Sequence, residues 1–377
     1  MKTALLPRRV LTPAGFEEGR CLLITDGQIA AILPATDCPA DADRRSLDGD
    51  LLPGFIDLQV NGGGGVLLND RPTIEGVAAI AAAHRRFGTT GLFPTLISDD
   101  LDVVAKAIAA IDAAIGQGVP GILGIHIEGP FLNPAKKGIH DASKFRTLDA
   151  DAIDLLSSLK NGRTLVTLAP ELAPPGAVRT LAGRGVIVAA GHTDAAYEQV
   201  RAALDDGLAG FTHLYNAMTQ LGSRTPGAVG AALEDRDSWC GLIVDGHHVH
   251  PAALRVALAA KSADRLVLVT DAMPTVGSAE KQFTLNGQTI LADDGRCVSP
   301  DGTLAGSDLD MAMAVRNAER LMRVDYETAV RMATASPARA MRMSEERGEI
   351  RHGLAADLVL VDDRKQVLET WIAGNPL

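Results

Sequence analysis

Cysteine is scarce in this sequence, and the few cysteines are scattered. The chain has four of them among 377 residues, and no two form a C-x-x-C pair: Cys21, Cys38, Cys240 and Cys297. Such spacing argues against a disulfide framework and against a thiolate zinc site. We expect these residues to be ordinary thiols of the core or the surface.

Long apolar runs and long basic runs are also absent. No apolar stretch reaches the length of a membrane span, and the apolar run before Pro7 is too short for a secretory signal. We therefore expect a cytoplasmic protein without a membrane partner. No Lys/Arg run exceeds two residues and the formal net charge is −11, which disfavours nucleic acid as a partner. An anionic small substrate remains compatible, because local cations and N–H groups suffice to hold a phosphate.

The sequence does contain a regular alternation of apolar and Ala-rich segments. Strand-like runs lie at residues 51–60, 89–97, 121–129, 164–170, 185–192, 209–215, 238–248 and 265–273. Helix-like stretches lie between several of them, at 73–88, 100–116 and 194–207. Because the apolar runs are continuous, they indicate parallel strands covered on both faces. Eight such units predict an α/β fold, the TIM (β/α)8 barrel.

The two ends of the chain differ from this middle. Residues 1–50 contain two apolar runs around Asp26-Gly27, which is typical of a hairpin with a tight primed turn. Residues 348–377 again suggest short strands and no long helix. We predict that both ends, 1–50 and 345–377, form one small β-sandwich domain next to a barrel at 51–344.

Polar side chains follow the predicted strands where each one ends. They are Gln59, Asn61, Glu128, His192, His213, Asp245, His247, His248, His250 and Asp271. Active sites of TIM barrels lie at the carboxyl ends of the strands, so we expect these groups to meet. Two neutral imidazoles and one carboxylate supply three ligands to a zinc-like ion and leave a position for water, as in catalytic metal sites.

Each of these residues has a structural alternative when it is taken alone. A single histidine at a strand end is more often a packing residue, Glu128 can close a turn, and Asp271 can cap one. Several titratable groups at successive strand ends are harder to explain in this way, because each would need its own buried partner. We assign Asp57 to structure, and Lys136 and Lys137 to either phosphate attraction or a solvated face.

Eight segments that span nearly the whole chain carry a family resemblance: PGFIDLQVNGGGG, HIEGPFLNPAKKGIHD, AGHTDA, FTHLYNAM, DGHHVHP, VTDAMP, GTLAGS and GEIRHGLAADLVLVD. With these segments the sequence resembles the N-acetylglucosamine-6-phosphate deacetylase family of the amidohydrolase superfamily. The resemblance implies hydrolysis of N-acetyl-D-glucosamine 6-phosphate to D-glucosamine 6-phosphate and acetate, in amino-sugar catabolism.

The resemblance also implies roles for individual residues. Metal ligands are expected at Glu128, His192 and His213, and the catalytic acid/base at Asp271. Substrate contacts are expected at Ile139, His140, Asn216, Ala217, Arg224, His248, Leu304, Ala305 and Gly306. Arg224 is expected to reach the phosphate from a neighbouring subunit, in a homodimer or a larger homo-oligomer.

One departure from the superfamily concerns the first strand. It usually carries His-x-His for a second metal, whereas this chain has Gln59-Val60-Asn61. The fourth strand, TLVTLAPE, ends without the lysine that related cyclic-amide hydrolases carboxylate. Amides are poor zinc ligands, so we expect one divalent metal per subunit, zinc first, with Fe²⁺ and Mn²⁺ as alternatives.

Two other functions stay open at this point. One is another enzyme, either a deacetylase of a different N-acyl amino sugar or a cyclic-amide amidohydrolase; THLYNAM and Arg224 argue against it. The other is a sugar-phosphate-binding barrel without catalysis, which the presence of Asp271 and all three expected metal ligands disfavours.

Overall fold

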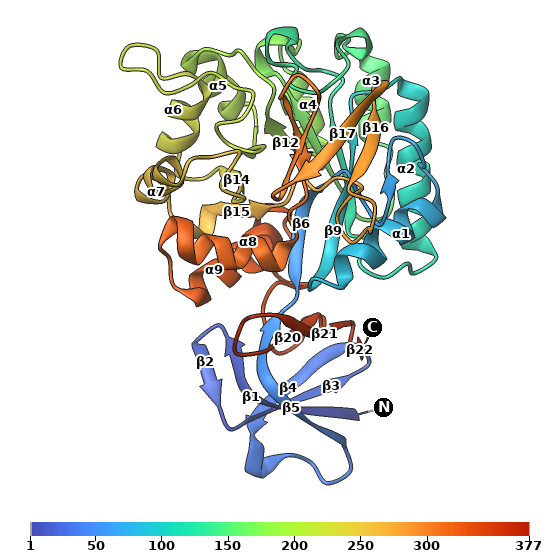
Figure 1. Cartoon of the computed structure of the whole chain (residues 1–377), viewed down its shortest axis with the longest axis vertical. Helices are drawn as coiled ribbons and strands as arrows, with labels where there is room; N and C mark the ends of the chain where they lie inside the picture. Colours follow the sequence, from blue (N-terminus) through green and yellow to red (C-terminus); the bar gives the residue numbers. More distant parts are fainter. Residues whose placement is uncertain (1, 377) are drawn as a thin grey trace.

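The computed structural model describes residues 2–376, and its largest part is a closed barrel of parallel strands (Figure 1). The strands are β6 (Phe55–Val60), β9 (Thr89–Ile97), β10 (Gly124–Glu128), β11 (Arg163–Leu168), β12 (Ile187–Ala190), β13 (Gly210–Phe211), β14 (Trp239–Ile243) and β15 (Leu266–Val269). Every strand residue except Arg163 is buried, because one face fills the interior and the other meets the helices. The predicted fold class is confirmed, and each predicted strand segment overlaps one of these strands; only β11 begins before its predicted segment, by one residue.

The barrel closes where the ends of β6 and β15 meet. The N–H of Asp271 donates to the carbonyl of Gln59 at 3.0 Å, and the N–H of Asn61 donates to the carbonyl of Ala272 at 2.9 Å. These bonds lie just beyond the carboxyl end of β15, so the closure also fixes the backbone at the mouth of the barrel.

Asp57 supports the same closure from inside. Its carboxylate accepts the hydroxyl of Thr270 at 2.5 Å and the N–H groups of Thr270 and Gln59 at 3.2 Å. Burial raises the pKa of Asp57 to about 7, although these hydrogen bonds oppose the shift. Asp57 therefore has the structural role that the sequence indicates.

In the described part of the chain, ten α-helices accompany the strands: α1 (Ile74–Arg85), α2 (Leu101–Gly116), α3 (Ala150–Leu156), α4 (Ala177–Gly183), α5 (Tyr197–Asp205), α6 (Gly227–Glu234), α7 (Pro251–Ala260), α8 (Met311–Asn317), α9 (Tyr326–Met332) and α10 (Ala335–Ala340). The expected helices at 73–88, 100–116 and 194–207 correspond to α1, α2 and α5. The side chain of Thr73 caps α1 by accepting the N–H of Gly76 at 3.1 Å. Within residues 2–376, none of the helices has both the length and the apolar character needed to cross a membrane.

Both ends of the chain meet in the small β domain below the barrel (Figure 1). One sheet has the order β22-β21-β20-β5-β1-β3-β4, with β2 paired to β1. Its strands are β1 (Lys2–Thr12), β2 (Gly15–Glu18), β3 (Arg20–Thr25), β4 (Gln28–Pro34), β5 (Asp43–Pro53), β20 (Leu358–Val361), β21 (Val367–Ile372) and β22 (Asn375–Pro376). The expected hairpin turns at Asp26 and Gly27, with φ of 52° and 78°.

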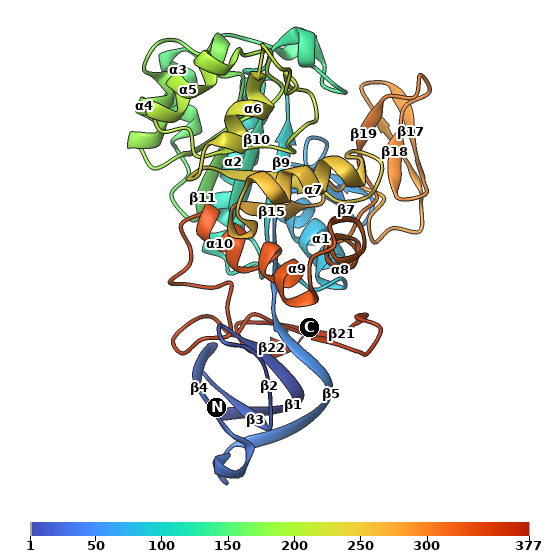
Figure 2. The same ribbon diagram turned by 90° about the vertical axis from the view of Figure 1, so that its left-hand side faces the viewer.

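An insert between β15 and α8 adds a separate antiparallel sheet that the sequence analysis did not predict. It comprises β16 (Gln282–Leu285), β17 (Gln288–Asp293), β18 (Arg296–Val298) and β19 (Leu304–Ser307), and it projects to one side of the barrel (Figure 2). Its hairpin turns are Asn286-Gly287 and Asp294-Gly295, all with positive φ. These dipeptides are strong hairpin signals, so the sequence does encode the insert. A two-residue pair, β7 (Gly62–Gly63) and β8 (Val66–Leu67), follows β6.

Candidate active site

A cavity of about 230 Å³ opens at the carboxyl ends of the barrel strands. Its walls come from the strand ends, from the loop after β10 and from β19, and they contain Asn61, Ile97, Glu128, Gly138, Ile139, His140, His192, His213, Asn216, Ala217, Ile243, His248, Asp271, Met273, Thr303, Leu304 and Gly306. The barrel thus brings together residues from distant parts of the sequence, as its topology requires.

Glu128 and two histidines form a compact buried cluster in this cavity. The Nε2 atoms of His192 and His213 lie 3.2 and 2.9 Å from Glu128 Oε1, and 3.1 Å from each other. Burial opposes the charge on Glu128, but hydrogen bonds with both histidines outweigh it and hold the pKa of Glu128 well below its ordinary value. A carboxylate and two imidazole nitrogens converging at these distances are a donor set for one cation.

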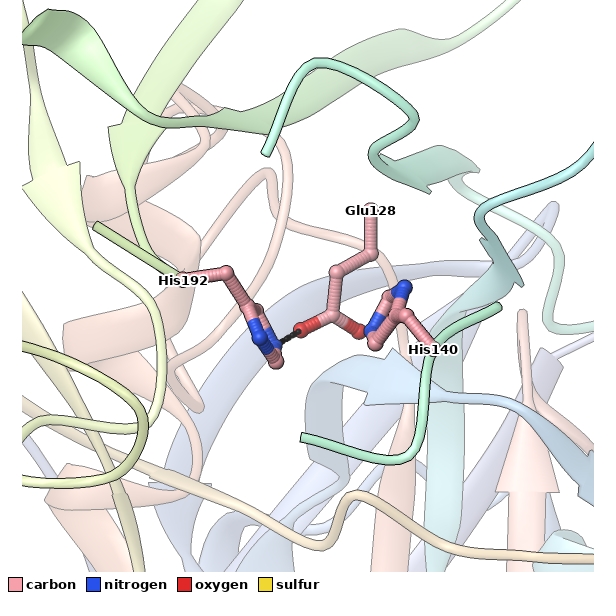
Figure 3. Close-up of side chains that lie close together, drawn as sticks. All are labelled: Glu128, His140 and His192. Atoms are coloured by element: carbon pink, nitrogen blue, oxygen red, sulfur yellow. Dashed lines mark hydrogen bonds and ion pairs between the residues drawn. The ribbon is translucent and has the colours of Figure 1, made fainter. Parts of the chain in front are cut away.

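The tautomer of His192 suits metal binding. Its Nδ1 lies 2.8 Å from the carbonyl oxygen of Lys136, and a carbonyl can only accept, so Nδ1 carries the proton. The lone pair is then on Nε2, which faces Glu128 (Figure 3). A backbone carbonyl behind the ring is a common way to orient a ligating histidine.

His140 lies on the other side of Glu128 (Figure 3), and Glu128, His140 and His192 are close enough together to hold an ion as well. The backbone N–H of Ser98 points at His140 Nδ1 at 3.3 Å, and the Ser98 hydroxyl is 2.8 Å away. Because an N–H can only donate, Nδ1 must accept. Burial lowers the pKa of His140 to about 3, so the ring is neutral and its proton sits on Nε2. His140 therefore presents a hydrogen-bond donor, which favours His213 over it as third ligand.

The two amides of the first strand face carboxylates. Gln59 Nε2 donates to Glu128 at 3.1 Å and to Asp271 Oδ1 at 3.1 Å, and Asn61 Nδ2 donates to the same Asp271 oxygen at 2.6 Å. The amide NH₂ groups thus donate hydrogen bonds to the two acids. These bonds orient the carboxylates. Burial, followed by repulsion from Glu128, raises the pKa of Asp271 to about 6.

His248 is held at the cavity wall by a carboxylate. Its Nδ1 lies 2.5 Å from Asp245 Oδ2, and both side chains are about 95% or more buried. Although burial opposes it, the hydrogen bond with His248 holds the pKa of Asp245 below its ordinary value. His248 Nδ1 therefore donates to Asp245. His247 turns elsewhere, because its Nε2 lies 2.8 Å from the carbonyl of Asp294 in the insert.

The backbone around the cluster is unusual for residues with side chains. His192, His213 and Asp271 have φ of 50°, 32° and 53°, in the left-handed region that glycine favours. Gly306, with φ of 66°, comes so close to Asp271 that a Cβ at position 306 would lie 2.7 Å from the Asp271 carbonyl oxygen. That approach explains the glycine of GTLAGS.

Two residues expected at the site do not line the cavity. Ala305 is fully buried in β19 between two lining residues, whereas Arg224 is exposed on the loop before α6. Among residues 2–376, no Lys or Arg lines the cavity at all. The structure adds wall residues that the sequence analysis did not single out, namely Ile97, Gly138, Ile243, Met273 and Thr303; these apolar or small side chains carry no chemical signal in a sequence.

Comparisons with known proteins agree with this architecture. The amidohydrolase family profile matches residues 51–377. The chain is 41% identical over 372 residues to an N-acetylgalactosamine-6-phosphate deacetylase of Shewanella sp. (strain ANA-3), covering 98% of this chain and 94% of that one. It is 32% identical over 379 residues to an N-acetylglucosamine-6-phosphate deacetylase of Haemophilus influenzae (strain ATCC 51907 / DSM 11121 / KW20 / Rd), covering 100% and 99%.

Solved structures extend the likeness to three dimensions. The N-acetylglucosamine-6-phosphate deacetylase of Pasteurella multocida superposes with a TM-score of 0.96 at 30% identity, covering 100% of both chains. A mutant of the Mycobacterium smegmatis enzyme, in complex with N-acetyl-D-glucosamine-6-phosphate, gives 0.90 at 31%, covering 100% of this chain and 99% of that one. The chain therefore belongs to the amidohydrolase family, within its group of N-acetyl amino-sugar 6-phosphate deacetylases.

Proposed function

We propose that this protein hydrolyses N-acetyl-D-glucosamine 6-phosphate to D-glucosamine 6-phosphate and acetate, as a step of amino-sugar catabolism. The observation that carries the proposal is the cluster of Glu128, His192 and His213 with Asp271 beside it, in a chain matched end to end by such deacetylases. A phosphorylated sugar is charged and does not cross a bilayer unaided, which supports the cytoplasm as the place of the reaction.

We assign Glu128, His192 and His213 as the ligands of one divalent ion. Nitrogen and carboxylate donors suit zinc first, with Fe²⁺ and Mn²⁺ as alternatives. The amides of Gln59 and Asn61 direct protons at Glu128 and Asp271, which argues for one ion rather than two. When bound, the ion supplies an acidified water and an electrophile for the acetamide carbonyl.

Asp271 is proposed to move the protons. With a pKa of about 6, it is ionised at neutral pH and can take a proton from the attacking water. The amides of Gln59 and Asn61 aim the carboxylate by binding the same oxygen, Oδ1, and so leave Oδ2 for this transfer. The proton then passes from Asp271 to the amine nitrogen as the C–N bond breaks.

Two histidines are proposed to bind the substrate. His140, whose Nε2 carries a proton, can donate to an oxygen of the sugar or of the reacting carbonyl. His248 donates its Nδ1 proton to Asp245, so its Nε2 presents a lone pair that can accept a hydroxyl of the sugar. Ile139, Asn216, Ala217, Leu304 and Gly306 line the same cavity, and we propose that they enclose the acetyl-sugar.

The phosphate needs a cation that the cavity of one chain does not supply among the described residues. We propose that Arg224 of the partner subunit provides it, since a guanidinium grips two phosphate oxygens at once. Arg224 lies on an exposed loop whose neighbour Leu221 is 56% exposed, which is consistent with a contact between subunits. This proposal makes a homodimer, or a larger homo-oligomer, necessary for full activity.

A second substrate deserves equal testing. Relatives at 41% and 37% identity are N-acetylgalactosamine-6-phosphate deacetylases, so the C4 epimer is the specific alternative. The epimers differ only in the direction of one hydroxyl, and the acetamide and phosphate that the site must hold are common to both.

The decisive experiment measures acetate release from both phosphorylated epimers and from unphosphorylated N-acetylglucosamine, with zinc supplied. We expect turnover of N-acetyl-D-glucosamine 6-phosphate, with little activity on the unphosphorylated sugar. The variant Arg224→Ala should raise KM for the phosphorylated sugar at least tenfold and leave the slow reaction of the unphosphorylated sugar unchanged. Faster turnover of the galacto epimer would reassign the substrate, and no release from any sugar by zinc-loaded protein would overturn the proposal.

A further inference from the structure

The two histidines proposed as ligands differ in the hydrogen-bond partner of Nδ1, the ring nitrogen that faces away from the cluster. His192 Nδ1 has the Lys136 carbonyl at 2.8 Å. His213 Nδ1 is buried, and within residues 2–376 no protein atom offers it a hydrogen bond. A buried N–H without a partner costs about 1 to 3 kcal/mol, so this atom requires an explanation.

A second such atom belongs to a side chain that lines a small cavity together with His213. Inside the barrel below the cluster is a cavity lined by Leu58, Gln59, His126, Leu165, Thr212, His213, Trp239, Gly241 and Val269, all of them buried. The indole Nε1 of Trp239 is also buried and also lacks a partner within residues 2–376. Two unpartnered polar atoms therefore belong to side chains that line one small cavity.

The two side chains cannot satisfy each other. His213 turns Nε2 toward Glu128 and His192, so a lone pair at Nε2 for a cation requires the proton on Nδ1. The indole of Trp239 can only donate. Both groups are then donors, and what they need is one acceptor with two lone pairs placed between them.

The cavity has the size of that acceptor. It leaves about 10 Å³ for the centre of a water molecule, which corresponds to a single water. Polar groups for the protons of that water are present on the lining, in the side chains of Gln59 and Thr212. The nitrogens of the neighbouring His126 are already engaged by Thr95 and Thr167, at 3.1 and 2.7 Å.

We propose that one water molecule is bound in this cavity, accepts hydrogen bonds from His213 Nδ1 and Trp239 Nε1, and thereby sets the tautomer of His213. Trp239 is then a positioning residue for the metal site, acting through water from the end of the barrel opposite the mouth. The inference rests on His213 being a ligand, as proposed above. Partners of this kind behind a ligating histidine commonly contribute 10- to 100-fold to metal affinity.

A high-resolution crystal structure of the zinc-bound protein tests the water directly. We expect a density peak within hydrogen-bonding distance of both His213 Nδ1 and Trp239 Nε1. A dry cavity, or direct bonds from both nitrogens to protein atoms, overturns the proposal. This measurement needs no variant and no substrate, so it is independent of whether the protein deacetylates any sugar.

The variant Trp239→Phe tests the positioning role. It removes the N–H and should weaken zinc affinity about tenfold, measured by competition with a chromogenic chelator. Trp371→Phe is the matched control, because the chain has only two tryptophans and Trp371, 2% exposed in the small domain, is also buried, as is Trp239 at 5%. Both variants should lower the melting temperature, but only the first should change zinc affinity. Equal zinc affinity in Trp239→Phe and wild type would refute the role.

Discussion

The mouth of the barrel and the small β domain differ in where residues with positive φ occur and in which groups surround their buried acids. In the small domain, the residues with positive φ, such as Asp26 and Ala373, lie in turns between strands, and the buried Asp50 is gripped by Arg8 and Arg9. At the mouth, positive φ falls on residues proposed to carry the chemistry, and the acids there face amides and histidines. One region is built for stability, whereas the other keeps its charges only partly compensated.

The largest expected effect is a loss of activity caused by a substitution at the mouth of the barrel, which leaves the small domain unchanged. Asp271→Asn keeps the shape but removes the proton acceptor, so kcat should fall by at least about 10³-fold. Zinc content should stay at the wild-type level because Asp271 is not an assigned ligand, and the melting temperature should not fall, since repulsion from Glu128 disappears. Acetate release, metal analysis and thermal melts check this. Near-wild-type turnover would mean that another group moves the protons.

Asp57 allows a further test of this difference, because it lies directly beneath the mouth and both of its carboxylate oxygens accept hydrogen bonds. Its pKa is raised to about 7, so the fold retains a proton that the unfolded chain releases above its ordinary pKa of about 4. The contribution of Asp57 to the stability of the wild-type protein should therefore fall as pH rises from 4 to 7 and level off above 7. Relative to wild type, Asp57→Asn should gain up to about 3 kcal/mol between pH 5 and pH 7.

Urea unfolding of both proteins across this pH range measures the difference directly. Subtracting the two curves removes the contribution of every other titrating group. A difference that does not change with pH would show that Asp57 is ionised in the fold throughout.

The smallest expected effect belongs to the small domain. Asp50→Asn weakens the hydrogen bonds from Arg8 and Arg9 and should cost about 1–2 kcal/mol of stability, since solvent screens the half-exposed arginines. Asp363→Asn is the control, because Asp363 is an 81% exposed partner of Arg8 and should change stability very little. Both variants should retain wild-type kcat and KM, and a kinetic defect in Asp50→Asn would show that the two regions are coupled.

The sequence predicts the barrel well because burial on both faces leaves a direct trace. A run such as residues 89–97 becomes β9 with the same bounds, and the Asp26-Gly27 turn dictates its own hairpin. The insert β16–β19 is not predicted, although Asn286-Gly287 and Asp294-Gly295 indicate two hairpin turns within it. The runs between those turns are short and partly exposed, so their apolar pattern is weak.

The sequence predicts which residues lie at the cavity, but it does not predict the contacts between their side chains. Strand ends identify Glu128, His192 and His213 because their chemistry is conspicuous there. That Ser98 fixes the tautomer of His140, or that an indole lies beneath His213, depends on side-chain directions that no spacing encodes. The positive φ of the two histidines proposed as ligands is equally invisible in the sequence, since nothing marks a histidine for the left-handed region.

The closure of the barrel has a consequence for how the protein fails. The N–H of Asp271 bonds to Gln59 of the first barrel strand, and its carbonyl accepts the N–H of Ser307 from the insert. The group proposed to move protons is thus also the junction of three chain segments. Any opening of the barrel between β6 and β15 displaces the Asp271 carboxylate first. Activity should therefore be lost at a lower denaturant concentration than the one that unfolds the protein.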